Sequence, residues 1–110
     1  MRRGDVVLIV APGDLGKPRP AIVVQSDELG DETTSVVLVP MSSDLQRIGR
    51  LRPLIEPGVG KGIELRSQIM TDKVVGLERK RIRRLVGHLP FDDMARVDQA
   101  LLLVLGLIGH

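Results

Sequence analysis

The first half of the chain carries short apolar runs, rich in β-branched residues, separated by polar or Gly- and Pro-containing segments. Short runs bounded in this way predict β-strands. The run over residues 6–11 is apolar throughout, which predicts a strand buried on both faces. We expect the strands to cover residues 6–11, 19–25, 34–41, 51–56 and 64–71, with shorter strands at 74–75 and 85–89.

The last third of the chain has a helical pattern instead. Residues 78–84 predict a short helical turn, and a longer helix follows Pro90, with Asp92 as its expected N-cap. Apolar residues on one face at helical spacing are Met94, Val97, Leu101, Leu105 and Ile108, and Leu102, Leu103 and Val104 widen that face. So broad an apolar surface indicates burial either within the chain's own barrel or against a second subunit, and we favour the subunit.

Composition places the chain among single-domain globular proteins, with one domain over residues 1–110. It has no cysteine, which excludes disulfides and thiolate metal sites, and its longest apolar stretch is too short to span a membrane. We therefore expect a cytoplasmic protein.

The formal net charge of +2 is unevenly distributed. Residues 45–84 hold eleven basic and four acidic side chains, so this block carries +7. Such a block indicates either a polyanionic partner or a solvated basic face. Phe91 is the only aromatic residue, so a nucleic acid would be held by Arg, Lys and backbone groups rather than by base stacking.

Five segments, taken in order, resemble the MazF/PemK family of toxins and together cover nearly the whole chain. They are Arg3-Gly4-Asp5-Val6, residues 19–27 beginning Arg19-Pro20-Ala21, residues 37–43 ending Pro40-Met41-Ser42-Ser43, Ser67-Gln68-Ile69-Met70-Thr71-Asp72-Lys73, and the ending formed by residues 97–101 and 105–107. The resemblance implies a mainly β fold with a C-terminal helix, specifically a small SH3-like barrel of the MazF/PemK/CcdB kind. It also implies a homodimer and a cognate antitoxin whose flexible, acidic C-terminal segment blocks the RNA site.

The family resemblance further implies an endoribonuclease that cuts single-stranded mRNA at selected sequences without a metal. In this reaction the 2′-hydroxyl attacks the adjacent phosphate and leaves cyclic-phosphate and 5′-hydroxyl ends. Arg19 matches the family's catalytic Arg, and its planar guanidinium suits phosphate oxygens. Ser42 matches a position of Thr or Ser and can donate to phosphate. Asp72 matches a carboxylate that serves some members as a base, although Met70 stands where those members carry an Arg.

Other polar residues are candidates for binding RNA. Asp14 lies where members often carry a Glu, and Gln25 is a candidate for contacting base edges. Expected phosphate contacts are Lys17, Arg47, Arg50 and Lys73, with Arg52, Lys61 and the basic residues of 79–84 as further candidates. We predict no cofactor and no metal site, because His88 and His110 stand alone in the sequence.

Three alternatives remain open from the sequence. A CcdB-like gyrase poison shares the fold but presents a C-terminal Trp, and this chain has no Trp. A catalytically silent regulatory barrel would agree with the missing Arg at Met70. An unrelated basic RNA-binding barrel would be unusual with a single aromatic residue.

Overall fold

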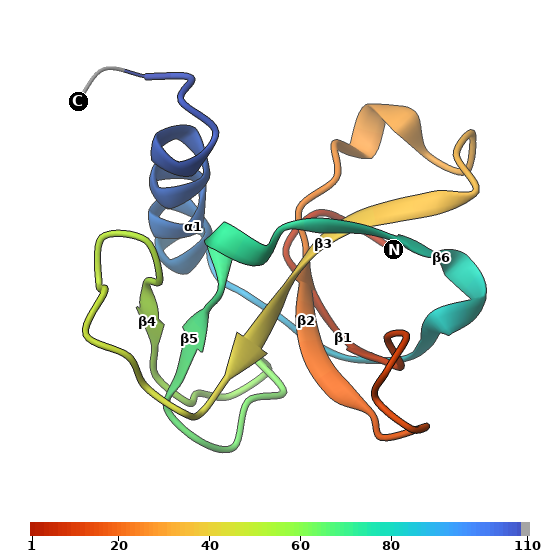
Figure 1. Ribbon diagram of the computed structural model, residues 1–110, viewed down its shortest axis with the longest axis horizontal. Coiled ribbons are helices and arrows are strands. Elements are labelled where there is room, and N and C mark those ends of the chain that lie inside the picture. The colour runs from red at the N-terminus through yellow and green to blue at the C-terminus, as the bar shows by residue number, and fades with distance from the viewer. Residues whose placement is uncertain (109–110) are drawn as a thin grey trace.

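In a computed structural model, which describes residues 1–108, the strands form one bent sheet and a single α-helix follows them (Figure 1). The strands are β1 (Asp5–Ile9), β2 (Arg19–Val23), β3 (Ser35–Ser42), β4 (Leu54–Ile55), β5 (Ser67–Ile69), β6 (Val75–Glu78) and β7 (Ile82–His88). Short 3-10 helices are η1 (Asp27–Leu29), η2 (Thr71–Lys73) and η3 (Arg79–Arg81), and the helix is α1 (Phe91–Val104).

The strand order of the sheet is β4-β5-β3-β2-β1-β7, and every pairing is antiparallel. β3 is the hub of this sheet, because its first half pairs with β6 while its later residues pair with β2 and β5. Because the long β3 changes partners along its length, the strands form a half-barrel that is not closed by a pairing between β6 and β7 within residues 1–108. In Figure 1, β4, β5 and α1 lie on one side of β3 and β1 and β2 on the other.

Two apolar clusters fill the two faces of the central strands. One packs Val6, Ile22 and Val39 against Val97 and Leu101 of α1. The other packs on the opposite face of these strands. It is built from Val7, Ile9, Ala21, Val23, Val36, Leu38 and Leu77. Neighbouring residues of β1 therefore contribute to opposite clusters, which confirms the predicted strand buried on both faces.

Strand positions agree with the predictions, but several lengths do not. The strand predicted over 51–56 is reduced to β4, and the one over 64–71 to β5, because turns and loop contacts use the flanking backbone groups. Pro40 does not end β3, since its carbonyl still accepts from Met70 N at 2.9 Å. The helical turn predicted over 78–84 is confined to η3, and β7 begins already at Ile82.

The C-terminal helix begins two residues earlier than the predicted cap at Asp92 implies. Pro90 is its N-cap residue, without a side-chain capping bond, so the expected cap at Asp92 is wrong and Asp92 lies in the first turn. Pro suits this end because its missing N–H would have no helical partner. The helix ends at Val104, before Leu105 and Ile108, and Gly106 follows with a φ of 71°. Within residues 1–108, no helix is long and apolar enough to cross a membrane.

A long loop crosses β7 at two glycines. The N of Gly62 and the carbonyl of Lys61 lie so close to Gly87 that no Cβ would fit there, and a Cβ on Gly62 would meet the Val86 carbonyl. His88 N also donates to Gly60 O at 2.9 Å. The crossing fixes residues 58–65 beside the open edge of the barrel, where they form one wall of the groove described below.

The buried carboxylate of Asp5 links the start of β1 to the end of β7. Asp5 Oδ2 accepts from Arg2 N at 2.7 Å, and Asp5 Oδ1 lies 2.7 Å from His88 Nδ1. Burial opposes ionisation of Asp5, but the bonds from Arg2 N and from His88 outweigh it and lower the pKa of this carboxyl below its ordinary value.

Acid should therefore weaken the folded state through Asp5. Because its pKa is lower when folded than when unfolded, its stabilising contribution is present above the ordinary pKa near 3.8 and is lost as the pH falls through the lowered value. Urea unfolding from about pH 5 to about pH 2 should show stability falling with pH, and Asp5→Asn should flatten that slope. The exposed Glu32 lies outside the helices and strands and makes no ion pair among residues 1–108, so Glu32→Gln is the control and should leave the slope unchanged. An equal slope in Asp5→Asn would contradict this assignment.

Candidate active site

A large open groove of about 1290 Å³ lies where the β1–β2, β3–β4 and β4–β5 loops meet. In Figure 1 the β1–β2 and β4–β5 loops lie toward the lower edge, and the β3–β4 loop starts there and rises at the left. The charged side chains that line the groove are five basic ones (Lys17, Arg19, Arg52, Lys73 and Arg84) and three acidic ones (Asp14, Asp44 and Glu64). The lining therefore carries a formal charge of +2, five minus three, which favours an anionic ligand.

Arg19 is the first residue of β2 and projects into this groove from a segment with proline on either side. Its Nε lies 3.1 Å from Asp14 Oδ2, and its side chain is about half exposed. Asp14 is fixed in turn, because its Oδ2 accepts from Ala11 N at 3.2 Å and its side chain is largely buried. The loop thus orients Arg19 through one edge of its guanidinium and leaves the other N–H donors free toward the groove.

Ser42 ends β3 on the neighbouring strand. The β2–β3 pairing ends at Ala21 and Pro40, and Arg19 and Ser42 are each two residues beyond that pair on their own strand. Ser42 Oγ accepts from Asp44 N at 3.0 Å, so the hydroxyl proton remains available for donation. Arg19, Ser42 and Asp14 all line the same groove, and the structure therefore brings these three predicted residues together.

Asp72 does not line the groove itself but holds a residue that does. Arg52 Nε donates to Asp72 Oδ1 at 2.9 Å, and its second terminal nitrogen donates to Oδ2 at 3.0 Å. The hydrogen bond from Arg52 lowers the pKa of Asp72, and the same bond raises the pKa of Arg52. Arg52 is thus the cationic partner that the sequence seemed to lack at Met70. Twenty residues separate the pair, so no local motif pointed to it.

The predicted phosphate contacts divide into two groups. Lys17 and Lys73 line the groove, and so does Arg84, which was only a further candidate. Arg47 and Arg50 lie on the exposed loop after β3 and outside this groove, although Arg50 lines a second, smaller one beside α1.

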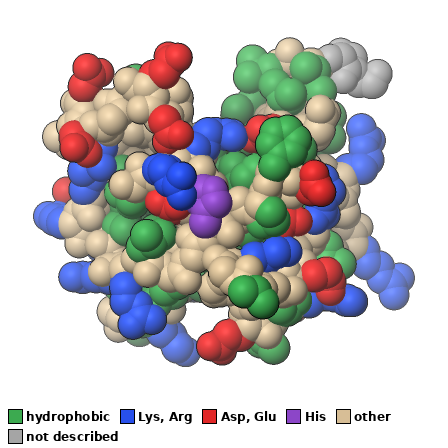
Figure 2. All heavy atoms as spheres, turned by 180° about the vertical axis from the view of Figure 1, so that it is seen from behind, with side chains coloured by type: hydrophobic (Ala, Val, Ile, Leu, Met, Phe, Trp, Pro, Cys, Tyr) green, Lys and Arg blue, Asp and Glu red, His purple; other side chains and the backbone are tan. Residues whose placement is uncertain are grey.

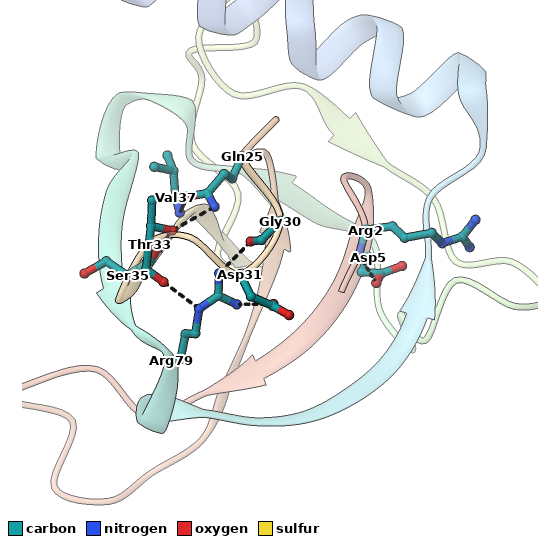
Figure 3. A network of polar contacts seen from close by, with 9 residues as sticks. All are labelled: Arg2, Asp5, Gln25, Gly30, Asp31, Thr33, Ser35, Val37 and Arg79. Atoms are coloured by element: carbon teal, nitrogen blue, oxygen red, sulfur yellow. Dashed lines mark hydrogen bonds and ion pairs between the residues drawn. The ribbon is translucent and has the colours of Figure 1, made fainter. Parts of the chain in front are cut away.

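Gln25 lies away from the groove, in the polar network drawn in Figure 3. Its Oε1 accepts from Val37 N at 3.0 Å, and its Nε2 donates to Thr33 Oγ1 at 3.2 Å. Arg79 closes the network by donating to the Thr33 and Gly30 carbonyls, both at 2.8 Å. Because its amide is buried and bonded at both ends, Gln25 holds the η1 loop against β3 rather than facing a ligand in the groove.

Histidine and carboxylate side chains do not gather into a metal-binding set within residues 1–108. His88 pairs with Asp5 at the start of β1, whereas Arg19 pairs with Ile9 at the end of that strand, and His110 lies outside the described residues. The groups that do converge on the groove are guanidinium, ammonium, hydroxyl and carboxylate side chains, a set suited to binding phosphate and moving a proton.

Comparison with known proteins agrees with this arrangement. A curated relative from Mycolicibacterium smegmatis, named "Probable endoribonuclease MazF", is 41% identical over 110 residues, covering 99% of this chain and all of the relative. An endoribonuclease solved with its cognate antitoxin, from a mycobacterial species, superposes with a TM-score of 0.84 at 19% identity and covers 100% of this chain and 99% of that one.

A MazE–MazF complex from Deinococcus radiodurans superposes with a TM-score of 0.77 at 21% identity and covers 96% of each chain. At these identities the solved structures support the fold alone. The family model for the PemK-like, MazF-like toxin of type II toxin-antitoxin systems matches residues 2–105. The chain therefore belongs to the PemK/MazF family of toxins.

Proposed function

We propose that this toxin is a cytoplasmic, metal-independent endoribonuclease that cuts single-stranded mRNA at selected sequences. The observation that carries the proposal is the placement of Arg19 and Ser42 on adjacent strand ends, with Asp14 at Arg19, in a basic groove. The 41% identity to a curated relative named as an endoribonuclease supports the same activity.

The reaction that fits these groups is attack of a 2′-hydroxyl on its own 3′-phosphate. Asp14 takes the 2′-proton, the new O2′–P bond forms, and the bond from phosphorus to the 5′-oxygen breaks. The products are a 2′,3′-cyclic phosphate and a 5′-hydroxyl, whose proton comes from the solvent in this open groove. Asp14 is the carboxylate best placed for this step, because it both lines the groove and contacts Arg19.

Arg19 and Ser42 stabilise the charge that develops on the phosphorus-bound oxygens. The guanidinium binds them through its free N–H edge, and the Ser42 hydroxyl donates from the neighbouring strand. Arg19 acts through its charge rather than as an acid, since a guanidinium gives up protons only at very high pH. Lys17, Lys73 and Arg84 hold the flanking phosphates, which sets affinity and its salt dependence.

The basic groove also suits the acidic C-terminal segment of a cognate antitoxin, which would compete with RNA. A second copy of the toxin fits the C-terminal region, where Figure 2 shows hydrophobic side chains gathered at the end of α1. Leu105, Leu107 and Ile108 are exposed there, and Leu102, Leu103 and Val104 are only partly buried. Sedimentation equilibrium should therefore yield the mass of a dimer rather than the 12.0 kDa monomer.

A substrate without the nucleophile tests the reaction. Once the cleavage site of an RNA has been mapped, a single 2′-deoxynucleotide is placed on the 5′ side of that site. The proposal predicts that the substituted strand binds but is not cut there, whereas the same substitution two nucleotides away has no effect. Cleavage at the 2′-deoxy position would show that the nucleophile is not the 2′-hydroxyl and would contradict the mechanism.

Replacing Ser42 by alanine should lower kcat by about tenfold to a hundredfold, because a hydrogen bond to a developing anion is lost. Ser43→Ala is the matched control, since Ser43 is the next residue and also lines the groove. We expect Ser43→Ala to stay within about twofold of the parent protein in single-turnover cleavage. A larger loss in Ser43→Ala than in Ser42→Ala would exclude the assigned role.

A further inference from the structure

Arg52 occupies an unusual position at the junction of two grooves. It lines the large groove, and it also lines a smaller one of about 570 Å³ between the loop after β3 and α1. Its side chain is 11% exposed. Asp72 takes two of its N–H donors, and the remaining donors have no hydrogen-bond acceptor among residues 1–108. A largely buried guanidinium with unused donors that borders a groove is suited to an anion supplied by a ligand.

The loop that carries Arg52 is also held by contacts other than the Arg52–Asp72 pair. Gln68 is buried, and its amide accepts from Gln46 N at 2.7 Å and donates to Gln46 O at 2.8 Å. The hydroxyl of the fully buried Thr71 also donates to the Leu51 carbonyl. These contacts fasten both ends of the β3–β4 loop, one to β5 and the other to η2. The two hydrogen bonds from Arg52 to Asp72 therefore serve mainly to fix the plane of the guanidinium.

We propose that Arg52 contacts a phosphate of the bound RNA and that Asp72 is its positioning residue rather than the general base. This assignment rests on the proposed ribonuclease function and extends it. Asp72 has both carboxylate oxygens engaged by Arg52 and lies outside the lining of the groove. Asp14, by contrast, lines the groove and uses only Oδ2 in its contacts with Arg19 and Ala11 among residues 1–108, so its Oδ1 is available to take a proton.

The phosphate that Arg52 contacts lies on the part of the bound RNA that faces the second groove, away from the β1–β2 loop that precedes Arg19. Arg50 and Arg96 line that smaller groove, so the path of positive charge continues past Arg52. Arg52 therefore orients the RNA through one flanking phosphate, and a lysine at this position would keep the charge but lose the planar fork.

The test is a double-mutant cycle in single-turnover cleavage of a fixed RNA. Arg52→Ala should lower kcat/KM about a hundredfold, and Asp72→Asn about tenfold. The double variant should be no worse than Arg52→Ala within about threefold, because Asp72 acts only through Arg52. Arg52→Lys should recover only a small part of the loss. Affinity for a non-cleavable 2′-deoxy version of the RNA should fall in parallel.

The pair formed by Arg66 and Glu56 provides matched controls. Arg66 Nε lies 2.9 and 2.7 Å from the two Glu56 oxygens, and both residues lie outside the two groove linings. Arg66→Ala and Glu56→Gln should stay within about twofold of the parent protein. Thermal unfolding monitors folding, and if Arg52→Ala does not fold, Arg52→Lys and Asp72→Asn decide the question.

The outcomes separate this inference from the proposed function. If the parent protein cuts RNA but both Arg52 variants cut it at the parent rate, Arg52 makes no phosphate contact and the inference is wrong. If Asp72→Asn costs the same factor with and without Arg52, or removes the acid limb of the pH–rate profile, Asp72 acts directly as a base and the inference is also wrong. A parent protein that cuts no RNA would instead reject the proposed function.

Discussion

Replacing Arg19 by alanine is expected to reduce cleavage of single-stranded RNA about 100- to 1,000-fold, equivalent to roughly 3–4 kcal/mol of transition-state stabilisation. Among residues 1–108 the half-exposed guanidinium makes no hydrogen bond or ion pair besides the one with Asp14, so the loss should arise in the reaction and not in folding. Because Arg19 binds charge that develops only during attack, kcat should fall more than the affinity for uncleaved RNA. Single-turnover rates and binding of a 2′-deoxy analogue measure the two effects separately.

Two variants sharpen this experiment. Arg83 is exposed on β7 and does not line the groove, so Arg83→Ala removes one positive charge without touching the site and should change cleavage less than about threefold. Arg19→Lys keeps the charge but not the planar fork and should recover only part of the rate. Cleavage by Arg19→Ala at the rate of Arg83→Ala would exclude a catalytic role for Arg19.

The second large effect concerns folding and arises at Gly87. A Cβ at this position would lie 2.6 Å from Gly62 N and would overlap the Lys61 carbonyl group, and all of these are backbone atoms. Since neither β7 nor the crossing loop can yield by rotating a side chain, Gly87→Ala should destabilise the protein by about 3 kcal/mol or more. Urea unfolding followed by far-UV circular dichroism measures this loss.

Gly76 in β6 is the matched control for a strand glycine. The nearest atom to a Cβ there would be Ser35 Cβ at 3.9 Å, an ordinary contact, so Gly76→Ala should be neutral or slightly stabilising. Equal stability of the two alanine variants would show that the loop does not cross β7 as closely as described. Loss of stability in Gly87→Ala should be accompanied by loss of cleavage, because the same loop forms a wall of the groove.

Most of the fold could be predicted because the signals are local. The β-branched runs located β1, β2 and β3, and the apolar stripe from Met94 to Leu101 located α1. The shortness of β4 and β5 could not be foreseen, since their ends are set by tertiary contacts such as Thr71 with Leu51. Propensity also misplaced the start of α1, because an Asp in the first turn looks like a cap while Pro90 occupies that position.

The candidate site, like the fold, was predictable from the sequence only where local motifs identify its residues. Arg19 and Ser42 were identified from motifs, and the antiparallel register explains why two distant segments meet. The partner of Asp72 could not be predicted, because Arg52 reaches it only through the turn between β3 and β4. Gln25 looked suited to base contacts in sequence, yet only the structure reveals that Thr33 and Val37 occupy both ends of its amide.

Mapping the ends of cleaved RNA in excess EDTA tests the central claim most directly. The purified toxin, free of antitoxin and verified as folded, is incubated with a long single-stranded RNA, and the products are analysed at both new ends. The account predicts discrete cuts that bear 2′,3′-cyclic phosphates and 5′-hydroxyls. Uncut RNA, or cuts that leave 5′-phosphates, would contradict it.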